Sequence, residues 1–150
     1  MLRYNRHMIV NKLARREYGI TDTWVAGIVL TGAEIKSLRG ERGSLRDAYV
    51  KLINGEFFLV GADIPQYGHF SGQTYDAKRS RKLLLKESEI RKIVQKIEGK
   101  NLTIVPLKLF LKGRWMKCEI GIGKGKKEWE KREDIKKRDV AREMAKAMKN

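Results

Sequence analysis

Cysteine and histidine are scarce in this sequence. Its 150 residues include one cysteine, Cys118, and two histidines, His7 and His69. A single cysteine excludes an intrachain disulfide. Neither histidine has a cysteine or a second histidine at ligand spacing, so a zinc site has little support. We expect no metal and no cofactor.

Long apolar runs and linkers are also missing. No run approaches the ~18 apolar residues of a membrane-spanning helix, and the first residues precede neither an apolar secretory core nor a small-residue cleavage site. No stretch rich in Pro, Gly or Ser divides the chain. These absences predict a cytoplasmic protein with one core domain and no membrane partner.

Acidic residues are too few to balance the basic ones. The chain has 34 Lys and Arg against 18 Asp and Glu, a formal charge of +16 and a pI of about 10.1. Such an excess destabilises a compact chain by self-repulsion unless an anionic partner neutralises it. RNA or DNA is the first candidate for that partner, and a membrane surface, the second, is disfavoured by the lack of a long apolar run.

Side chains arranged for catalysis are not apparent. The pair Glu133-Asp134 lies in a charged tail rather than around an apolar pocket, and no serine occupies a Gly-x-Ser-x-Gly turn. Gly121-x-Gly123-x-Gly125-Lys126 lacks the spacing and hydroxyl of a P-loop. These glycines instead indicate a bulge or a close backbone approach, for which an RNA backbone is an attractive partner. We expect that the protein is not an enzyme and has no catalytic residue.

Three segments carry strong local signals. Thr31-x-x-Glu34 is a capping box that begins a helix over 32–39. Asn54-Gly55 between the β-type runs 48–53 and 56–64 predicts a hairpin with a type I′ turn. Ile90, Ile93, Val94 and Ile97 have helical spacing, and Gly99 follows them.

The remaining patterns complete the expected fold. They predict a basic helix over 11–18 stopped by Gly19, a buried strand over 23–30 and a loop over 66–78. Two alternating strands follow, in which Val105, Leu107, Leu109 and Leu111 share one face and Met116, Cys118, Ile120 and Ile122 share another. Pro106 favours an edge or a bulge. The expected class is mainly β with helices (α+β), a small antiparallel β-barrel with about three peripheral helices.

The segment after Gly123 differs in kind. Residues 124–150 contain 11 Lys and Arg and 6 Asp and Glu, with a thin apolar stripe at Val140, Met144 and Met148. Isolated helices of this length are marginal in water. We therefore divide the chain into a barrel domain, 1–123, and a basic tail, 124–150, which is disordered when free and helical when bound.

Positive charge and one tryptophan suggest where a nucleic acid binds. Residues 78–92 carry a net charge of +5, and Arg79-x-Arg81 is compatible with one basic strand face. A charge run alone is usually a solvated face, but three patches and a basic tail favour nucleic acid. Trp129 is the best candidate for base stacking, whereas Trp24 and Trp115 are expected to be core or barrel-surface aromatics.

Four segments across nearly the whole chain form a recognisable pattern: Asn11-Lys12-Leu13-Ala14-Arg15, residues 26–39 (AGIVLTGAEIKSLR), residues 81–85 (RKLLL), and Lys124-Gly125-Lys126-Lys127 with Lys131-Arg132. In their order and spacing they resemble the SsrA-binding protein (SmpB) family, whose members bind transfer-messenger RNA in bacterial ribosome rescue.

The resemblance implies an OB-like barrel, monomeric, bound to the tRNA-like domain of transfer-messenger RNA. The protein replaces the missing anticodon half and delivers the RNA to stalled ribosomes for trans-translation, in which the nascent peptide is tagged. Its tail then folds in the small-subunit decoding centre and the empty mRNA channel.

Residue roles follow from the same resemblance. The expected RNA-binding set is Asn11, Lys12, Arg15, Lys36, Arg39, Arg81, Lys82, Leu84, Lys117, Lys124, Gly125, Lys126 and Lys127. The expected tail set is Trp129, Glu130, Lys131, Arg132, Ile135, Lys136, Lys137, Arg138 and Met148.

Two positions depart from the family pattern. Val25 stands where Glu is common, and Asp76-Ala77 stands where Asp-Pro precedes the basic Arg-x-Arg-Lys segment. Two other functions stay open: a generic OB-type single-strand binder, and a basic structural protein of the ribosome without an RNA partner of its own.

Overall fold

A computed structural model describes residues 8–68 and 74–149, and in helix α4 it leaves out the side chains of residues 128–130, 134, 148 and 149. The described elements run in the order β1 (Ile9–Val10), α1 (Ala14–Glu17), β2 (Tyr18–Ile28), α2 (Gly32–Arg39), β3 (Tyr49–Ile53), β4 (Glu56–Val60), β5 (Arg81–Leu84), α3 (Glu87–Ile97), β6 (Thr103–Lys112), β7 (Trp115–Gly125) and α4 (Glu128–Lys149). The loop expected over 66–78 has neither helix nor strand in its described residues. Residues 69–73, His69 among them, and His7 lie outside the description.

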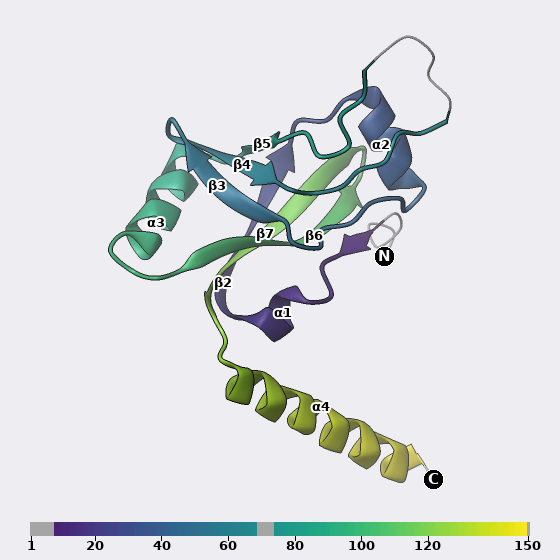
Figure 1. The fold of residues 1–150 in the computed structure, drawn as a ribbon, viewed down its shortest axis with the longest axis vertical. Helices are drawn as coiled ribbons and strands as arrows, with labels where there is room; N and C mark the ends of the chain where they lie inside the picture. The colour runs from purple at the N-terminus through teal and green to yellow at the C-terminus, as the bar shows by residue number, and fades with distance from the viewer. Residues whose placement is uncertain (1–7, 69–73, 150) are drawn as a thin grey trace.

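The described strands form one antiparallel sheet in the order β1-β6-β7-β2-β5-β4-β3 (Figure 1). The expected α+β class is therefore confirmed. The sheet is open, however, because its edge strands β1 and β3 do not pair with each other. Strand β1 covers β6 only at Leu109 and Lys108. Beyond β1, Tyr49 on β3 and Thr103 on β6 both line a hollow of about 590 Å³ next to α1.

The hairpin and the capping box form as expected. Asn54 and Gly55 have φ values of 50° and 78°, which are the positive angles that a type I′ turn requires. Strand β4 ends at Val60, and Gly61 with φ 81° follows it. At the start of α2, the Thr31 hydroxyl accepts from the Glu34 N–H, and a Glu34 carboxylate oxygen accepts from the Thr31 N–H.

Two expectations near the N-terminus are wrong. The helix is only four residues long, because Tyr18 is already extended and Gly19 pairs with Lys124 in the β2–β7 ladder. Strand β2 therefore begins five residues before the expected strand. It is not buried continuously, since Ala26 and Ile28 face the core while Val25 is 46% exposed.

A bulge in β6 divides its apolar residues between two faces. Pro106 lies at the register shift with β7, as a residue without an N–H favours. Leu109 then faces the main core, while Val105 and Leu107 pack with Ala14 of α1 on the other side of the sheet. The expectation that Val105, Leu107, Leu109 and Leu111 share one face is therefore wrong. The four expected core positions of β7 do share one face.

Helices α2 and α3 lie at opposite ends of the sheet (Figure 1). Ile93 of α3 is fully buried, and Gly99 has φ 69° after the helix ends. Lys96 Nζ lies 2.8 Å from Asp22 Oδ1 and 5.6 Å from the centre of the Trp24 ring, so α3 is also tied to β2 through charge.

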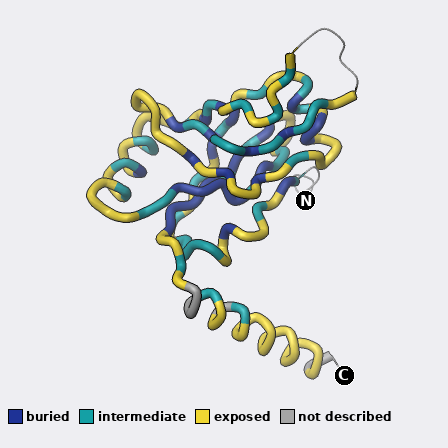
Figure 2. The backbone as a smooth tube through the Cα atoms, in the orientation of Figure 1, coloured by how far each residue is buried: buried dark blue, intermediate teal, exposed yellow. Residues whose placement is uncertain are grey.

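Helix α4 projects away from the sheet and is exposed along most of its length (Figures 1 and 2). Its first turns lie against α1, where Lys131 Nζ is 2.7 Å from Glu17 Oε2. The tail is thus helical in this structure, and its disorder in the free protein stays a prediction. Among the described helices, none is long and apolar enough to cross a membrane.

Candidate nucleic-acid interface

Leu84, Gly27 and Lys117 form a row across three neighbouring strands on the sheet face opposite the main core. Gly27 pairs with Leu84 of β5 on one side and with Lys117 of β7 on the other. A Cβ atom at Gly27 would lie 3.2 Å from Leu84 Cβ and 3.5 Å from Leu84 Cδ1. Leu84 therefore leans over the glycine, and it remains 51% exposed.

This row borders a hollow of about 330 Å³, here named the Trp115 hollow. Its apolar lining includes Leu30, Ile35 and Leu84, and its cations are Arg39, Arg114 and Lys117. Trp115 is 71% exposed. An exposed indole among cations and apolar side chains suits stacking with a base beside a phosphate backbone.

Sequence reasoning missed Trp115 and Arg114 as members of this surface. The strand alternation contains the relevant signal for Trp115. Met116 and Cys118 face the core, so Trp115 and Lys117 must face the other way. Arg114 carries no such signal, because it lies in the turn between β6 and β7.

Further cations extend the same face. Lys82 lies two residues before Leu84 on β5 and pairs with Glu56 at 3.0 Å. Lys36 and Arg39 lie exposed in the last turn of α2, where a second hollow of about 380 Å³ is lined by these two residues, Gly40 and Tyr67. Arg39 lines both hollows, so they form one continuous surface.

Arg81 does not belong to this surface, which corrects the expected basic strand face. Its side chain is 0% exposed, and Nη2 lies 2.6 Å from Glu34 Oε2. Its other N–H groups donate to the carbonyls of Ala62 and Ala77. Arg81 faces the interior because side chains alternate along β5, and its neighbour Lys82 faces out. We do not retain it as an RNA contact.

Glu34 is the charge partner that makes this burial possible. Arg79 Nη2 lies 2.6 Å from its other carboxylate oxygen. Burial acts to raise the pKa of Glu34, but hydrogen bonds from Arg79, the Thr31 N–H and Arg81 outweigh it and hold that pKa below its ordinary value. The carboxylate is therefore ionised and fully paired.

The other expected RNA-binding residues gather around α1 at the far end of the β2–β7 ladder. Asn11 Nδ2 donates to the Pro106 carbonyl at 2.9 Å, and Lys126 Nζ donates to the Arg15 carbonyl at 3.0 Å. The exposed members are Lys12, Arg15, Lys124, Gly125 and Lys127. Lys117 pairs with Gly27 and Lys124 with Gly19, so seven positions on β7, or roughly 23 Å, separate the two groups.

Two glycines of β7, Gly121 and Gly123, serve strand packing rather than an RNA backbone. A Cβ atom at Gly123 would lie 2.6 Å from the Gly19 carbonyl oxygen, and one at Gly121 would lie 2.9 Å from Ile20 Cγ2. Strand β2 itself thus occupies the space. Gly125 alone of these three has nothing within 4 Å of an added Cβ.

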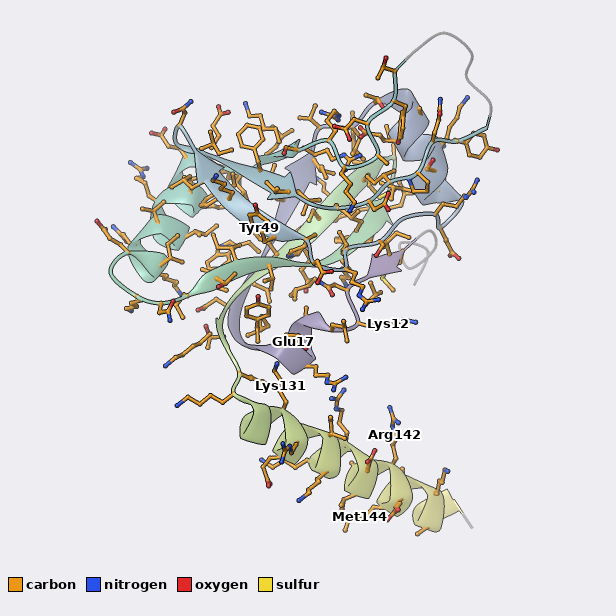
Figure 3. All side chains as sticks on the ribbon, viewed as in Figure 1. Lys12, Glu17, Tyr49, Lys131, Arg142 and Met144 are labelled. Atoms are coloured by element: carbon orange, nitrogen blue, oxygen red, sulfur yellow. The ribbon has the colours of Figure 1, made fainter. Side chains whose placement is uncertain are left out.

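The expected tail residues lie on α4. Lys131 is partly enclosed, with a side chain that is 17% exposed beside Glu17 (Figure 3). Ile135 is half-buried, while the exposed members are Arg132, Lys136, Lys137 and Arg138. Val140 and Met144 are 52% and 65% exposed, so the apolar stripe is unpartnered where it is described. The expectations for Trp129, Glu130 and Met148 concern side chains outside the described ones.

The two departures from the family pattern also have places in the fold. Val25 lies exposed on β2, two residues before Gly27 on the same sheet face. Asp76 Oδ1 accepts from the Lys78 N–H, and the Ala77 carbonyl accepts from Ile64 and Arg81. The Asp-Ala pair thus forms part of the support for Arg81.

The open antiparallel sheet, the continuous aromatic and cationic surface and the basic helical extension define a basic α+β protein with a surface suited to a polyanion. Comparison with known proteins narrows this class. The family model described as "SmpB protein" matches residues 8–150. The chain belongs to the SmpB protein family.

Curated relatives and a solved structure agree with this assignment. An SsrA-binding protein of Salinispora arenicola is 47% identical over 137 residues, covering 91% of this chain and 86% of the relative. One of Microcystis aeruginosa is 46% identical over 140 residues, covering 93% and 91%. A chain in a solved structure described as "tmRNA-SmpB: a journey to the center of the bacterial ribosome" superposes with a TM-score of 0.67 at 38% identity, covering 81% of this chain and 85% of the other.

Proposed function

We propose that this protein binds the tRNA-like domain of transfer-messenger RNA and delivers it to stalled ribosomes for trans-translation. The observation that carries the proposal is the family match over residues 8–150. The relatives are named for binding SsrA, and the solved neighbour is named for tmRNA and the ribosome. In this role the protein acts in the cytoplasm, where it binds the RNA and positions it on the ribosome without catalysing a reaction.

Charge and surface chemistry support an RNA partner. The chain's charge of +16 favours a polyanion, and the Trp115 hollow adds an exposed aromatic ring and apolar side chains to the cations. Phosphates supply most of the affinity in such interfaces, while stacked rings select accessible bases. We assign the Leu84–Gly27–Lys117 row and the residues around α1 to one RNA that spans both ends of the β2–β7 ladder.

The two-part organisation is also proposed. Residues 1–123 act as the RNA-binding domain, in which the sheet curls toward an OB-like barrel. Tyr49 of the edge strand β3 and Thr103 of β6 line the same hollow, which supports this curvature, because β6 lies next to the opposite edge strand β1. Residues 124–150 act as the tail, which occupies the decoding centre and the empty mRNA channel. The exposed stripe at Val140 and Met144 supports a partner for α4.

A competition measurement tests the proposed function. The purified chain is bound to a labelled tRNA-like domain at physiological salt, with equal excesses of elongator tRNA or single-stranded oligonucleotide as competitors. Clear preference for the tRNA-like domain is the expected result. Equal competition by the oligonucleotide would identify a generic single-strand binder. Binding to ribosomes in fixed ratio without transfer-messenger RNA would identify a structural ribosomal protein.

A further inference from the structure

Tyr67 shares a hollow with two cations of helix α2. This Tyr67 hollow, of about 380 Å³, is lined by Lys36, Arg39, Gly40 and Tyr67, and the tyrosine is 46% exposed. None of the described residues that line it carries a carboxylate. Within the described part of the chain, neither Lys36 nor Arg39 has an ion pair or a hydrogen bond from its side chain. The site therefore combines an accessible ring with two uncompensated positive charges.

The position of Tyr67 beside α2 is set by buried polar contacts. Ser37, which is 0% exposed, donates its hydroxyl to the carbonyl of Pro65, two residues before Tyr67. The Tyr75 hydroxyl donates to the Ile64 carbonyl at 2.6 Å. Buried Arg81 donates to the Ala62 carbonyl at 2.8 Å. The segment that leads to Tyr67 is thus attached to α2 and β5, which places the ring next to Lys36 and Arg39.

Helix electrostatics accounts for the cations but not for the whole arrangement. Lys and Arg in the last turn of a helix interact favourably with its carbonyl end. That effect requires no aromatic ring and no hollow. Arg39 also lines the Trp115 hollow, so the Tyr67 hollow continues the surface assigned to RNA. A ligand with a flat face and a negative charge matches both features.

We propose that the Tyr67 hollow binds one unpaired nucleotide of the RNA, its base against the Tyr67 ring and its phosphate at Lys36 and Arg39. The proposal rests on the proposed function and specifies it further. Bases inside a helix have both faces covered by their neighbours, whereas bases in loops are free to stack on an aromatic side chain. This part of the protein therefore recognises a loop of the tRNA-like domain rather than a stem.

Affinity measurements on surface variants test the assignment. Tyr67→Ala should weaken binding of the tRNA-like domain by roughly 5- to 150-fold, the range for loss of one stacked base. Tyr67→Phe retains the ring and should bind like the wild type. Arg39→Gln should lower the slope of log K against log salt by about 0.7, as for one phosphate of a single strand. Ile53→Ala is the control for loss of an exposed apolar side chain, because Ile53 is 38% exposed at the end of the edge strand β3 and lines none of the hollows described above.

A nucleotide map separates stacking from a general loss of affinity. Reactivity of the RNA 2′-hydroxyls is measured in complexes formed at saturating protein. Some nucleotides should be protected by the wild type and by Tyr67→Phe but not by Tyr67→Ala, and these nucleotides should be unpaired. The proposal would be overturned if the protection that Tyr67→Ala loses lay at paired stem nucleotides instead. Wild-type affinity of Tyr67→Ala, or an equal loss of affinity in Ile53→Ala, would also overturn it.

Failure of the nucleotide site can be distinguished from failure of the proposed function. If the wild type shows no preference for the tRNA-like domain, the function fails. The hollow is then tested with a ten-nucleotide single-stranded RNA, which Tyr67→Ala must still bind more weakly than Tyr67→Phe. An effect of Arg39→Gln without one of Tyr67→Ala would reduce the hollow to a phosphate contact and reject the nucleotide.

Discussion

Arg81 and Glu34 form an ion pair with side chains 0% and 1% exposed, between Nη2 and Oε2 at 2.6 Å. Glu34 also caps α2, and Arg81 holds the carbonyls of Ala62 and Ala77. One carboxylate thus joins α2, β5 and the chain that leads to Tyr67. Removal of either charge leaves the other buried without compensation.

Glu34→Gln should therefore destabilise the protein by about 3–5 kcal/mol, as for other buried pairs that lose one partner. Denaturant unfolding measures this change. The matched control is Glu56→Gln, which breaks the exposed Lys82–Glu56 pair and should cost about 0–1 kcal/mol. Similar losses for both variants would contradict the burial of the Glu34 pair.

Acid should weaken the wild type through the same carboxylate. Because the folded state lowers the pKa of Glu34, its stabilisation is complete above the ordinary value near 4.5 and disappears as pH falls toward the lower folded value. Below pH 4.5 the free energy of unfolding of Glu34→Gln should fall less steeply than that of the wild type. Parallel curves would assign the acid sensitivity to other carboxylates.

Gly27→Ala should weaken RNA binding through Leu84. The added Cβ would lie 3.2 Å from Leu84 Cβ, so the leucine must shift from its place over β2. We expect a loss of affinity comparable with that of Leu84→Ala and a double variant no worse than either, since both changes act on one contact. Gly32→Ala is the control, because nothing lies within 4 Å of a Cβ there. Additive losses would mean that the two residues act separately.

Lys127→Gln should lower the salt slope of RNA binding by about 0.7–0.9, the value for one neutralised phosphate. Lys127 is exposed just before α4. Lys126 donates its amine to the Arg15 carbonyl, so Lys126→Gln should also disturb the junction between α1 and β7. Filter binding from low to moderate salt measures both slopes. An unchanged slope for Lys127→Gln would assign this lysine to solvent or to ribosomal RNA.

Deletion of residues 133–150 should separate RNA binding from rescue. The truncated chain keeps Lys131 and its contact with Glu17. Its affinity for the tRNA-like domain should stay nearly unchanged, while peptide transfer on stalled ribosomes is lost. Gel shift and a reconstituted translation assay measure the two. Substantial loss of RNA affinity would reject the division at the tail.

Local patterns in the sequence predicted the elements that depend on adjacent residues. Positive φ at Asn54 and Gly55, the capping box of Thr31 and Glu34, and the apolar spacing of α3 all act within a few positions. The family segments likewise predicted where cations and Leu84 lie along the chain. Alternation in β7 identified its core face. The same alternation places Trp115 on the opposite face, although the sequence prediction left it as a core or barrel-surface aromatic.

The sequence by itself determined the mixed class, the hairpin, the capped helix and the excess of positive charge, because turn geometry, capping and composition need no distant partner. Only the tertiary structure decided that Arg81 is buried, that β6 divides its apolar residues at a bulge, that Gly121 and Gly123 accommodate β2, and that Tyr67 lies beside Lys36 and Arg39. Each of these depends on contacts between residues far apart in the chain. Whether a charge or a ring is paired, covered or free is fixed by those distant neighbours.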